Sequence, residues 1–211
     1  IKKWKEIIGQ DIAKYCVCGP ILEVGGGFGS FKEYSRSVVS TDIVQMPNLD
    51  VVCDAHLLPF SEGSFSNVVA IDVLHHLERP LLFFQQVSQV LDSGGRLVLV
   101  EPAITPVSRL IYAFHNETVD MSVYPLEDGP TSPQREPFEG NQAIGTLISG
   151  EYCKELEQKV PNLRMTVKRW KGVFAYPLSG GFRRWSLIPR WIVPEVLRFE
   201  DSCLSVFGSI I

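Results

Sequence analysis

Short apolar runs alternate with helical stripes over the first hundred residues. Residues 1–15 carry isoleucine and tryptophan at helical spacing, and a second helical stripe follows Pro80 and ends at Ser93-Gly94-Gly95. Apolar runs predict strands at 21–24, 38–42, 67–71 and 96–101, and a third strand in chain order just before Asp54. Continuous apolar strands alternating with helices are typical of a parallel sheet covered on both faces. We therefore predict an α/β fold with a doubly wound, mostly parallel sheet.

The composition adds the expectation of one globular domain over residues 1–211. The chain is 45% hydrophobic and 21% charged, and its net charge of −4 gives no reason to expect nucleic-acid binding. Five cysteines without a Cys-x-x-Cys pair, and four histidines, favour free thiols in a reducing cytoplasm and predict no metal site. No signal peptide is visible, and no apolar stretch of about 20 residues predicts a transmembrane segment.

The first predicted strand runs directly into a glycine-rich turn. Gly25, Gly27 and Gly29 are spaced G-x-G-x-G, and Ser30 stands where a dinucleotide fingerprint has its third glycine. Glycines allow positive φ and remove the Cβ atoms, so a ligand can lie against the backbone. A helix is expected next, with its amide N–H groups pointing at that ligand.

Asp42 follows the second strand at the spacing from the first strand that a ribose-binding acid requires. In a parallel sheet, ligands lie beyond the carboxyl ends of the strands, where a carboxylate can accept two hydrogen bonds from a ribose diol. The alternative is an aspartate that caps a helix or turn. We expect the ribose role for Asp42, with Ile43 beside it in the same site.

Three motifs carry a resemblance to a known family. The order E-x-G-x-G-x-G after a strand resembles motif I of the class I S-adenosylmethionine (SAM) dependent methyltransferases. The stretch Asp54 to Phe60 resembles D-A-x-x-L-P-F of the type 11 methyltransferases, and Val73 to Leu77 resembles their V-L-H-H-L sequence. The ending L-x-x-G-G-x-L-x-L-x-E-P also matches. The resemblance covers residues 20–102 and implies a Rossmann-like sheet with SAM as cofactor.

The resemblance also assigns roles to residues. Glu23 would order the glycine loop near the methionine end of SAM, Asp54 would accept a hydrogen bond from the adenine amine, and the backbone N–H of Ala55 would reach the ring. Asp72 would face the reactive end of the cofactor. Adjacent histidines point in different directions, so for His75 and His76 we expect one structural role and one at the border of the pocket, not a metal site.

Residues 103–150 depart from this rhythm and are rich in proline. A long insertion with apolar content is typical of a lid. Its polar residues suit a small, hydroxylated or sugar-type methyl acceptor; they are His115, Asn116, Glu117, Asp120, Tyr124, Glu136, Asn141 and Gln142. For a hydroxyl acceptor we expect the general base to be His115, Glu101 or Asp72. Deleting Glu127 to Glu136 should then abolish turnover and leave SAM affinity within about threefold.

The C-terminal third gives weaker signals. It predicts a helix at 151–159, a sixth strand at 163–170 and a late strand candidate at 206–211. Residues 182–199 combine tryptophan, isoleucine and arginine, which is compatible with a weak membrane-surface contact or a homodimer interface; the default expectation is packing against the insertion. Two other functions stay open: a SAM-binding protein without catalysis, and a nicotinamide-dependent Rossmann oxidoreductase.

Overall fold

The computed structural model describes residues 2–27, 30–35, 37–115, 118–132, 134, 136–172, 188–189 and 191–207. Its strands are β1 (Ile21–Val24), β2 (Val38–Asp42), β3 (Val51–Val52), β4 (Phe65–Ile71) and β5 (Leu91–Val100). Its α-helices are α1 (Lys2–Tyr15), α2 (Pro80–Val90), α3 (Pro106–His115), α4 (Ile144–Ser149), α5 (Cys153–Lys159) and α7 (Val193–Phe207). Two short 3₁₀ helices are η1 (Ser30–Glu33) and η2 (Leu74–His76).

The five strands form one parallel sheet in the order β3-β2-β1-β4-β5. The order reverses at β1, so β1 and β4 are central and the glycine turn leaves the sheet beside β4. Ligands bind at such a switch point, beyond the carboxyl ends of the strands. The predicted doubly wound, mostly parallel α/β fold is confirmed.

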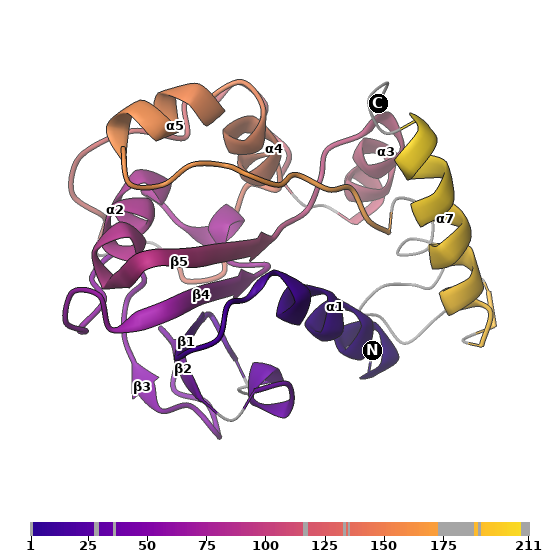
Figure 1. Ribbon diagram of the computed structural model, residues 1–211. Coiled ribbons are helices and arrows are strands. Elements are labelled where there is room, and N and C mark those ends of the chain that lie inside the picture. The colour runs from indigo at the N-terminus through magenta and orange to yellow at the C-terminus, as the bar shows by residue number, and fades with distance from the viewer. Residues whose placement is uncertain are drawn as a thin grey trace.

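Helices cover both faces of this sheet (Figure 1). On one face, Leu22 and Val68 belong to a buried cluster that includes side chains of α2, α4 and α5. On the other face, Ile21 and Val69 pack with Ile12 of α1 and with Phe31 of η1. Neighbouring residues of a strand point to opposite faces, so the apolar runs read from the sequence bury both sides at once.

Two expected elements differ from the structure near the motifs. The helix expected after the glycine loop is only the single 3₁₀ turn η1, and beyond it the Ser37 N–H donates to Ser35 Oγ at 3.4 Å. The fifth strand begins at Leu91, not at Arg96, and pairs with β4 through an irregular register that starts at Phe65. Ser66 Oγ donates to Asp92 Oδ2 at 2.7 Å and fixes this early pairing.

The C-terminal predictions are less accurate. The helix at 151–159 is confirmed as α5, but residues 163–170 form no strand, and Met165 and Val167 are exposed. The late strand candidate begins inside α7, and residues 208–211 lie outside the described part of the chain. Val193 and Leu197 of α7 pack on isoleucines of α1. In the part of the chain that the structure describes, no helix is long and apolar enough to cross a membrane.

Candidate active site

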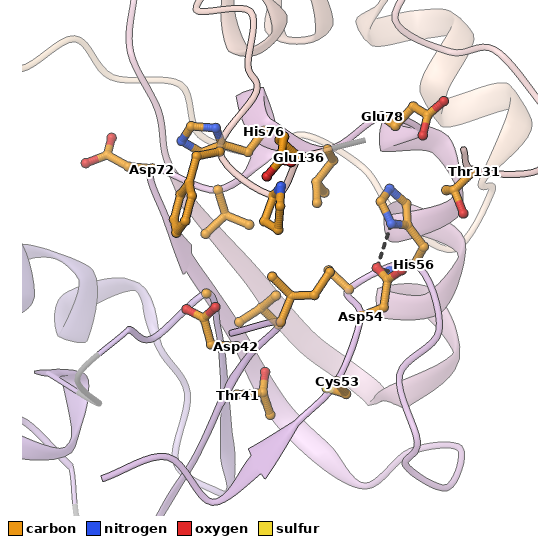
Figure 2. A pocket seen from close by; sticks show the side chains of 18 of the residues that line it. Thr41, Asp42, Cys53, Asp54, His56, Asp72, His76, Glu78, Thr131 and Glu136 are labelled. Atoms are coloured by element: carbon orange, nitrogen blue, oxygen red, sulfur yellow. Dashed lines mark hydrogen bonds and ion pairs between the residues drawn. The ribbon is translucent and has the colours of Figure 1, made fainter. Parts of the chain in front are cut away.

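A cavity of about 270 Å³ lies at the carboxyl ends of β1, β2, β3 and β4 (Figure 2). Its sheet side is lined by Val24, Gly25, Thr41, Asp42, Ile43, Cys53, Asp54, Ala55, His56, Asp72 and Val73. The remaining lining residues are His76, Leu77, Glu78, Thr131, Ser132, Glu136, Pro137 and Phe138. The structure therefore brings together six of the residues predicted to bind the cofactor: Gly25, Asp42, Ile43, Asp54, Ala55 and Asp72.

The buried carboxylate of Glu23 joins the start of η1, which follows the glycine turn, to β2. Its Oε1 accepts from the backbone N–H of Phe31 at 3.0 Å, and its Oε2 accepts from Ser40 Oγ at 2.6 Å. Gly25 has φ +68°, and a Cβ there would lie 2.2 Å from Val73 Cγ2, so both conformation and space require glycine. Glu23 is buried and is not among the residues that line the cavity. Gly29 lies outside the described residues.

Asp42 ends β2 at the edge of the cavity. Its Oδ2 accepts from the backbone N–H of Gly27 at 2.9 Å, and its Oδ1 accepts from that of Val44 at 3.0 Å. These two bonds fix the plane of the carboxylate and leave a second lone pair on each oxygen. Asp42 is therefore a rigid acceptor whose remaining capacity matches a pair of adjacent hydroxyl groups.

Asp54 follows β3 and pairs with His56 (Figure 2). Asp54 Oδ1 accepts from the backbone N–H of His56 at 2.9 Å and lies 2.6 Å from His56 Nδ1. The side-chain hydrogen bond from His56 is the main cause that lowers the pKa of Asp54, so this carboxylate is ionised at neutral pH. Ala55 is buried beside it, whereas Ile43, which lines the same cavity, is half exposed.

Asp72 and His76 border the cavity after β4. Asp72 has φ +56°, an unusual conformation for a residue with a side chain, and its N–H donates to Val100 O at 2.8 Å. Burial is the main cause that lowers the pKa of His76, and the charge of His75 adds to it. A lowered pKa keeps the His76 imidazole neutral at neutral pH, the form in which it can accept a proton.

Glu101 is buried behind the cavity and is occupied by three donors. Its Oε1 accepts from the backbone N–H groups of Val73 and Leu74 at 2.9 and 2.7 Å, and its Oε2 lies 2.7 Å from His75 Nδ1. Neither Glu101 nor His75 is among the residues that line the cavity. His115 ends α3, and its side chain lies outside what the structure describes.

A strap from the insertion closes one side of the cavity. We use this name for residues 127–139, of which Thr131, Ser132, Glu136, Pro137 and Phe138 line the cavity. The strap is anchored on the start of α2: Arg79 Nη1 donates to Glu127 Oε2 and the Ser132 N–H donates to Glu78 Oε2, both at 2.7 Å.

Two other polar residues expected from the insertion make hydrogen bonds within the protein. Asn141 exchanges hydrogen bonds with the backbone of Asp120, and Tyr124 donates to Glu155 of α5. Of the predicted polar set, Glu136 is the member that the cavity lining includes, and Asn116 and Glu117 lie outside the described residues.

Sequence reasoning gave no role to His56 or Cys53, nor to the strap residues Thr131, Ser132, Pro137 and Phe138. His56 occupies a variable position in the D-A-x-x-L-P-F stretch, and its signal was only its closeness to Asp54. The strap residues had no local signal, because their place depends on contacts with Glu78 and Arg79 far along the chain. Within the described residues, no group of three histidine, cysteine or acidic side chains is arranged to hold a metal ion.

Comparison with known proteins supports the sequence motifs. A family model described as a methyltransferase domain matches residues 22–99, from the middle of β1 to the end of β5. No curated protein matches the chain significantly.

Several solved structures match part of the chain. A protein from Pyrococcus horikoshii OT3 is 22% identical, with 56% of this chain and 64% of that chain covered and a TM-score of 0.45. A putative methyltransferase from Bacillus halodurans C-125 is 25% identical, with 51% and 52% covered and a TM-score of 0.39. A possible histamine N-methyltransferase from Thermotoga maritima is 17% identical, with 43% and 48% covered and a TM-score of 0.40. The chain thus spans about half to two thirds of these proteins.

The family match falls on the residues that form the sheet, the glycine turn and the carboxylates Asp42, Asp54 and Asp72. These are the positions at which the sequence resembled the type 11 methyltransferases, so the predicted family and its cofactor, SAM, are confirmed for this domain. Residues 22–99 thus match the methyltransferase domain family, over somewhat more than a third of the chain.

Proposed function

We propose that the protein transfers a methyl group from SAM to a small-molecule acceptor. The observation that carries this proposal is the pair of fixed carboxylates, Asp42 and Asp54, that line one cavity with the glycine turn. SAM presents a ribose diol and an adenine amine as hydrogen-bond donors, and these carboxylates are matching acceptors. Ser30 stands where a dinucleotide fingerprint has its third glycine, which favours SAM over a nicotinamide dinucleotide.

Bound SAM would supply an electrophilic methyl group on its sulfonium. The chain's own contribution is to hold the cofactor and align the acceptor, and such positioning supplies much of the rate. We assign the ribose to Asp42, the adenine to Asp54 and the ordering of the loop to Glu23. The Gly25, Gly27 and Gly29 loop would pass beside the methionine part. Asp72, at the end of β4, would border the reacting groups.

For the acceptor we propose a hydroxylated small molecule of sugar type, which would present several hydroxyl groups to the polar strap. A hydroxyl nucleophile needs a base, which we place at Asp72 or His76, because both line the cavity and the His76 imidazole is neutral. His115 stays a prediction. We propose that Glu101 is a positioning residue. Its carboxylate accepts three hydrogen bonds from the segment that carries His75 and His76, and so holds that segment in place.

The first prediction concerns the ribose. Replacing Asp42 with alanine should weaken SAM binding by about 1.5–3 kcal/mol, the cost expected for charge-assisted hydrogen bonds. Isothermal titration of SAM into the variant checks this, with thermal unfolding to confirm an intact fold. An unchanged affinity in the folded variant would remove Asp42 from the site. Titration with NAD and NADP, which we expect not to bind, tests the oxidoreductase alternative.

The second prediction concerns the adenine. Asp54→Asn keeps an oxygen acceptor and loses the charge, so SAM should bind about threefold to tenfold more weakly. S-inosylhomocysteine, which lacks the exocyclic amine, should lose less than S-adenosylhomocysteine does. Equal losses for the two ligands would contradict the adenine role of Asp54.

Turnover on a panel of hydroxylated acceptors separates an enzyme from a SAM-binding protein without catalysis.

The described cysteines Cys16, Cys18, Cys53 and Cys153 are free thiols, which supports the proposed cytoplasmic location. A contact with a membrane surface or a second copy through residues 182–199 stays a prediction, because residues 182–187 and 190 lie outside the described part of the chain.

A further inference from the structure

His56 stands between the acid assigned to adenine and the start of helix α2. Its Nδ1 lies 2.6 Å from Asp54 Oδ1, and its Nε2 lies 3.3 Å from the backbone nitrogen of Arg79 (Figure 2 shows the first contact). The imidazole is 12% exposed and lines the cavity. Both ring nitrogens therefore make a contact: Nδ1 with Asp54, and Nε2 with Arg79 at the start of α2.

These contacts fix the tautomer of the neutral ring. A backbone N–H can only donate, so Nε2 must accept from Arg79 with its lone pair, and the ring proton then sits on Nδ1. Nδ1–H points at Asp54 Oδ1. An ionised carboxylate has no proton to donate, so this oxygen is the acceptor. The neutral His56 ring thus satisfies both partners at once.

Both hydrogen bonds from His56 converge on the same oxygen of Asp54. The backbone N–H and Nδ1–H both reach Oδ1, and Oδ2 makes no hydrogen bond within the described part of the chain. A carboxylate held at one oxygen has a fixed rotation, so its second oxygen is the one left to accept from a ligand in the cavity. Rotation of Asp54 would break two hydrogen bonds, each worth about 1 kcal/mol or more.

Arg79, whose backbone N–H contacts the other side of the ring, is itself held by its neighbours. Arg79 precedes Pro80, the first residue of α2, and its backbone N–H lies outside the helix. Its guanidinium donates to Glu127 of the strap, and the neighbouring Glu78 accepts from Ser132. The ring therefore spans from the loop after β3 to a point that is fixed by α2 and by the strap.

We infer that His56 is a positioning residue for cofactor recognition: it orients Asp54 so that Oδ2 faces the adenine amine. This inference rests on the proposed function, because it requires Asp54 to recognise adenine. The alternative is a histidine that only fills space between β3 and α2. The two differ in one respect: a space-filling ring has no influence on the choice between adenine and hypoxanthine.

Two variants separate the two ring nitrogens. His56→Asn places an amide N–H near the position of Nδ1, so it keeps the donor to Asp54 and loses the contact with Arg79. His56→Gln reaches the position of Nε2, so its oxygen can accept from Arg79 while the donor to Asp54 is lost. The measurement is the ratio of the dissociation constants of S-inosylhomocysteine and S-adenosylhomocysteine for each protein, by titration calorimetry. Because both ligands bind the same variant, a general loss of stability or affinity cancels in the ratio.

We expect the wild-type protein to prefer S-adenosylhomocysteine and His56→Asn to keep that preference within about twofold. His56→Gln should lose about tenfold of the preference, the loss of one charge-assisted hydrogen bond. An unchanged preference in His56→Gln, or equal preferences in the Asn and Gln variants, would overturn the inference. If Asp54→Asn also left the preference unchanged, the adenine assignment itself would fail; if Asp54→Asn lost it and His56→Gln did not, only the role of His56 would fail.

Discussion

Replacing Glu101 with alanine is expected to lower the free energy of unfolding by about 3–5 kcal/mol, the usual cost of removing one partner of a buried polar network. The carboxylate is buried, and it accepts from two backbone N–H groups and from His75 Nδ1 at 2.7–2.9 Å. Alanine would leave all three donors without this acceptor. Each unsatisfied buried donor costs about 1–3 kcal/mol, so the losses together are large.

Helix α4 leaves little room for a replacement acceptor at this position. A Cβ built on Gly145 would lie 2.8 Å from Glu101 Cβ, so α4 packs directly against the side chain. The donors that Glu101 holds belong to Val73, which precedes η2, and to Leu74 and His75 of η2. The same segment carries Asp72 and His76, which line the cavity. Loss of Glu101 should therefore disorder one border of the active site as well as lower stability.

Glu101→Gln is the matched control. Its amide oxygen can still accept from the two backbone N–H groups, so the loss of stability should be about 1–2 kcal/mol. Urea denaturation measures both values. Turnover then separates the two roles of Glu101: a positioning residue keeps most of its activity as glutamine, whereas a general base loses nearly all of it in a folded protein. The second result would restore Glu101 as a catalytic residue.

The part of the fold that the sequence predicted well is the part where local pattern and tertiary structure agree. The strands at 21–24 and 38–42 match β1 and β2 residue for residue, because a strand buried on both faces reads as an apolar run bounded by turn residues. Asp42 and Asp54 follow such strands directly, so their place at one edge of the sheet follows from the strands alone.

The sequence failed where the outcome depends on distant partners. Residues 163–170 alternate as a strand would, yet Met165 and Val167 are exposed, because no described strand pairs with this segment. The early start of β5 depends on a hydrogen bond from Ser66 to Asp92, which no local pattern reveals. The role of His56 depends likewise on Arg79, which is distant in sequence.

The strap is a segment whose neighbours in the fold the sequence did not reveal. The insertion was expected to meet the acceptor and to leave the cofactor alone. In the structure, Thr131, Ser132 and Glu136 line the same cavity as Asp42 and Asp54. The cavity, at about 270 Å³, is slightly smaller than the ~300–1,000 Å³ of typical ligand sites, so we expect the strap to move when SAM and an acceptor bind together.

Replacing residues 127–136 with a glycine-serine linker of equal length should therefore abolish turnover and also weaken SAM binding by tenfold or more, a loss of at least about 1.4 kcal/mol. The linker removes three cavity-lining side chains and the anchor from Glu127 to Arg79, while Leu126, which is buried, and the bond from Asn141 N–H to His75 O remain. The matched control is Glu127→Gln, which weakens one exposed ion pair worth at most about 1 kcal/mol and should leave SAM affinity within about threefold. Calorimetry with SAM measures both variants, and thermal unfolding confirms that each is folded. If the linker variant bound SAM within threefold of the wild type, the strap would serve the acceptor alone, as the sequence first indicated.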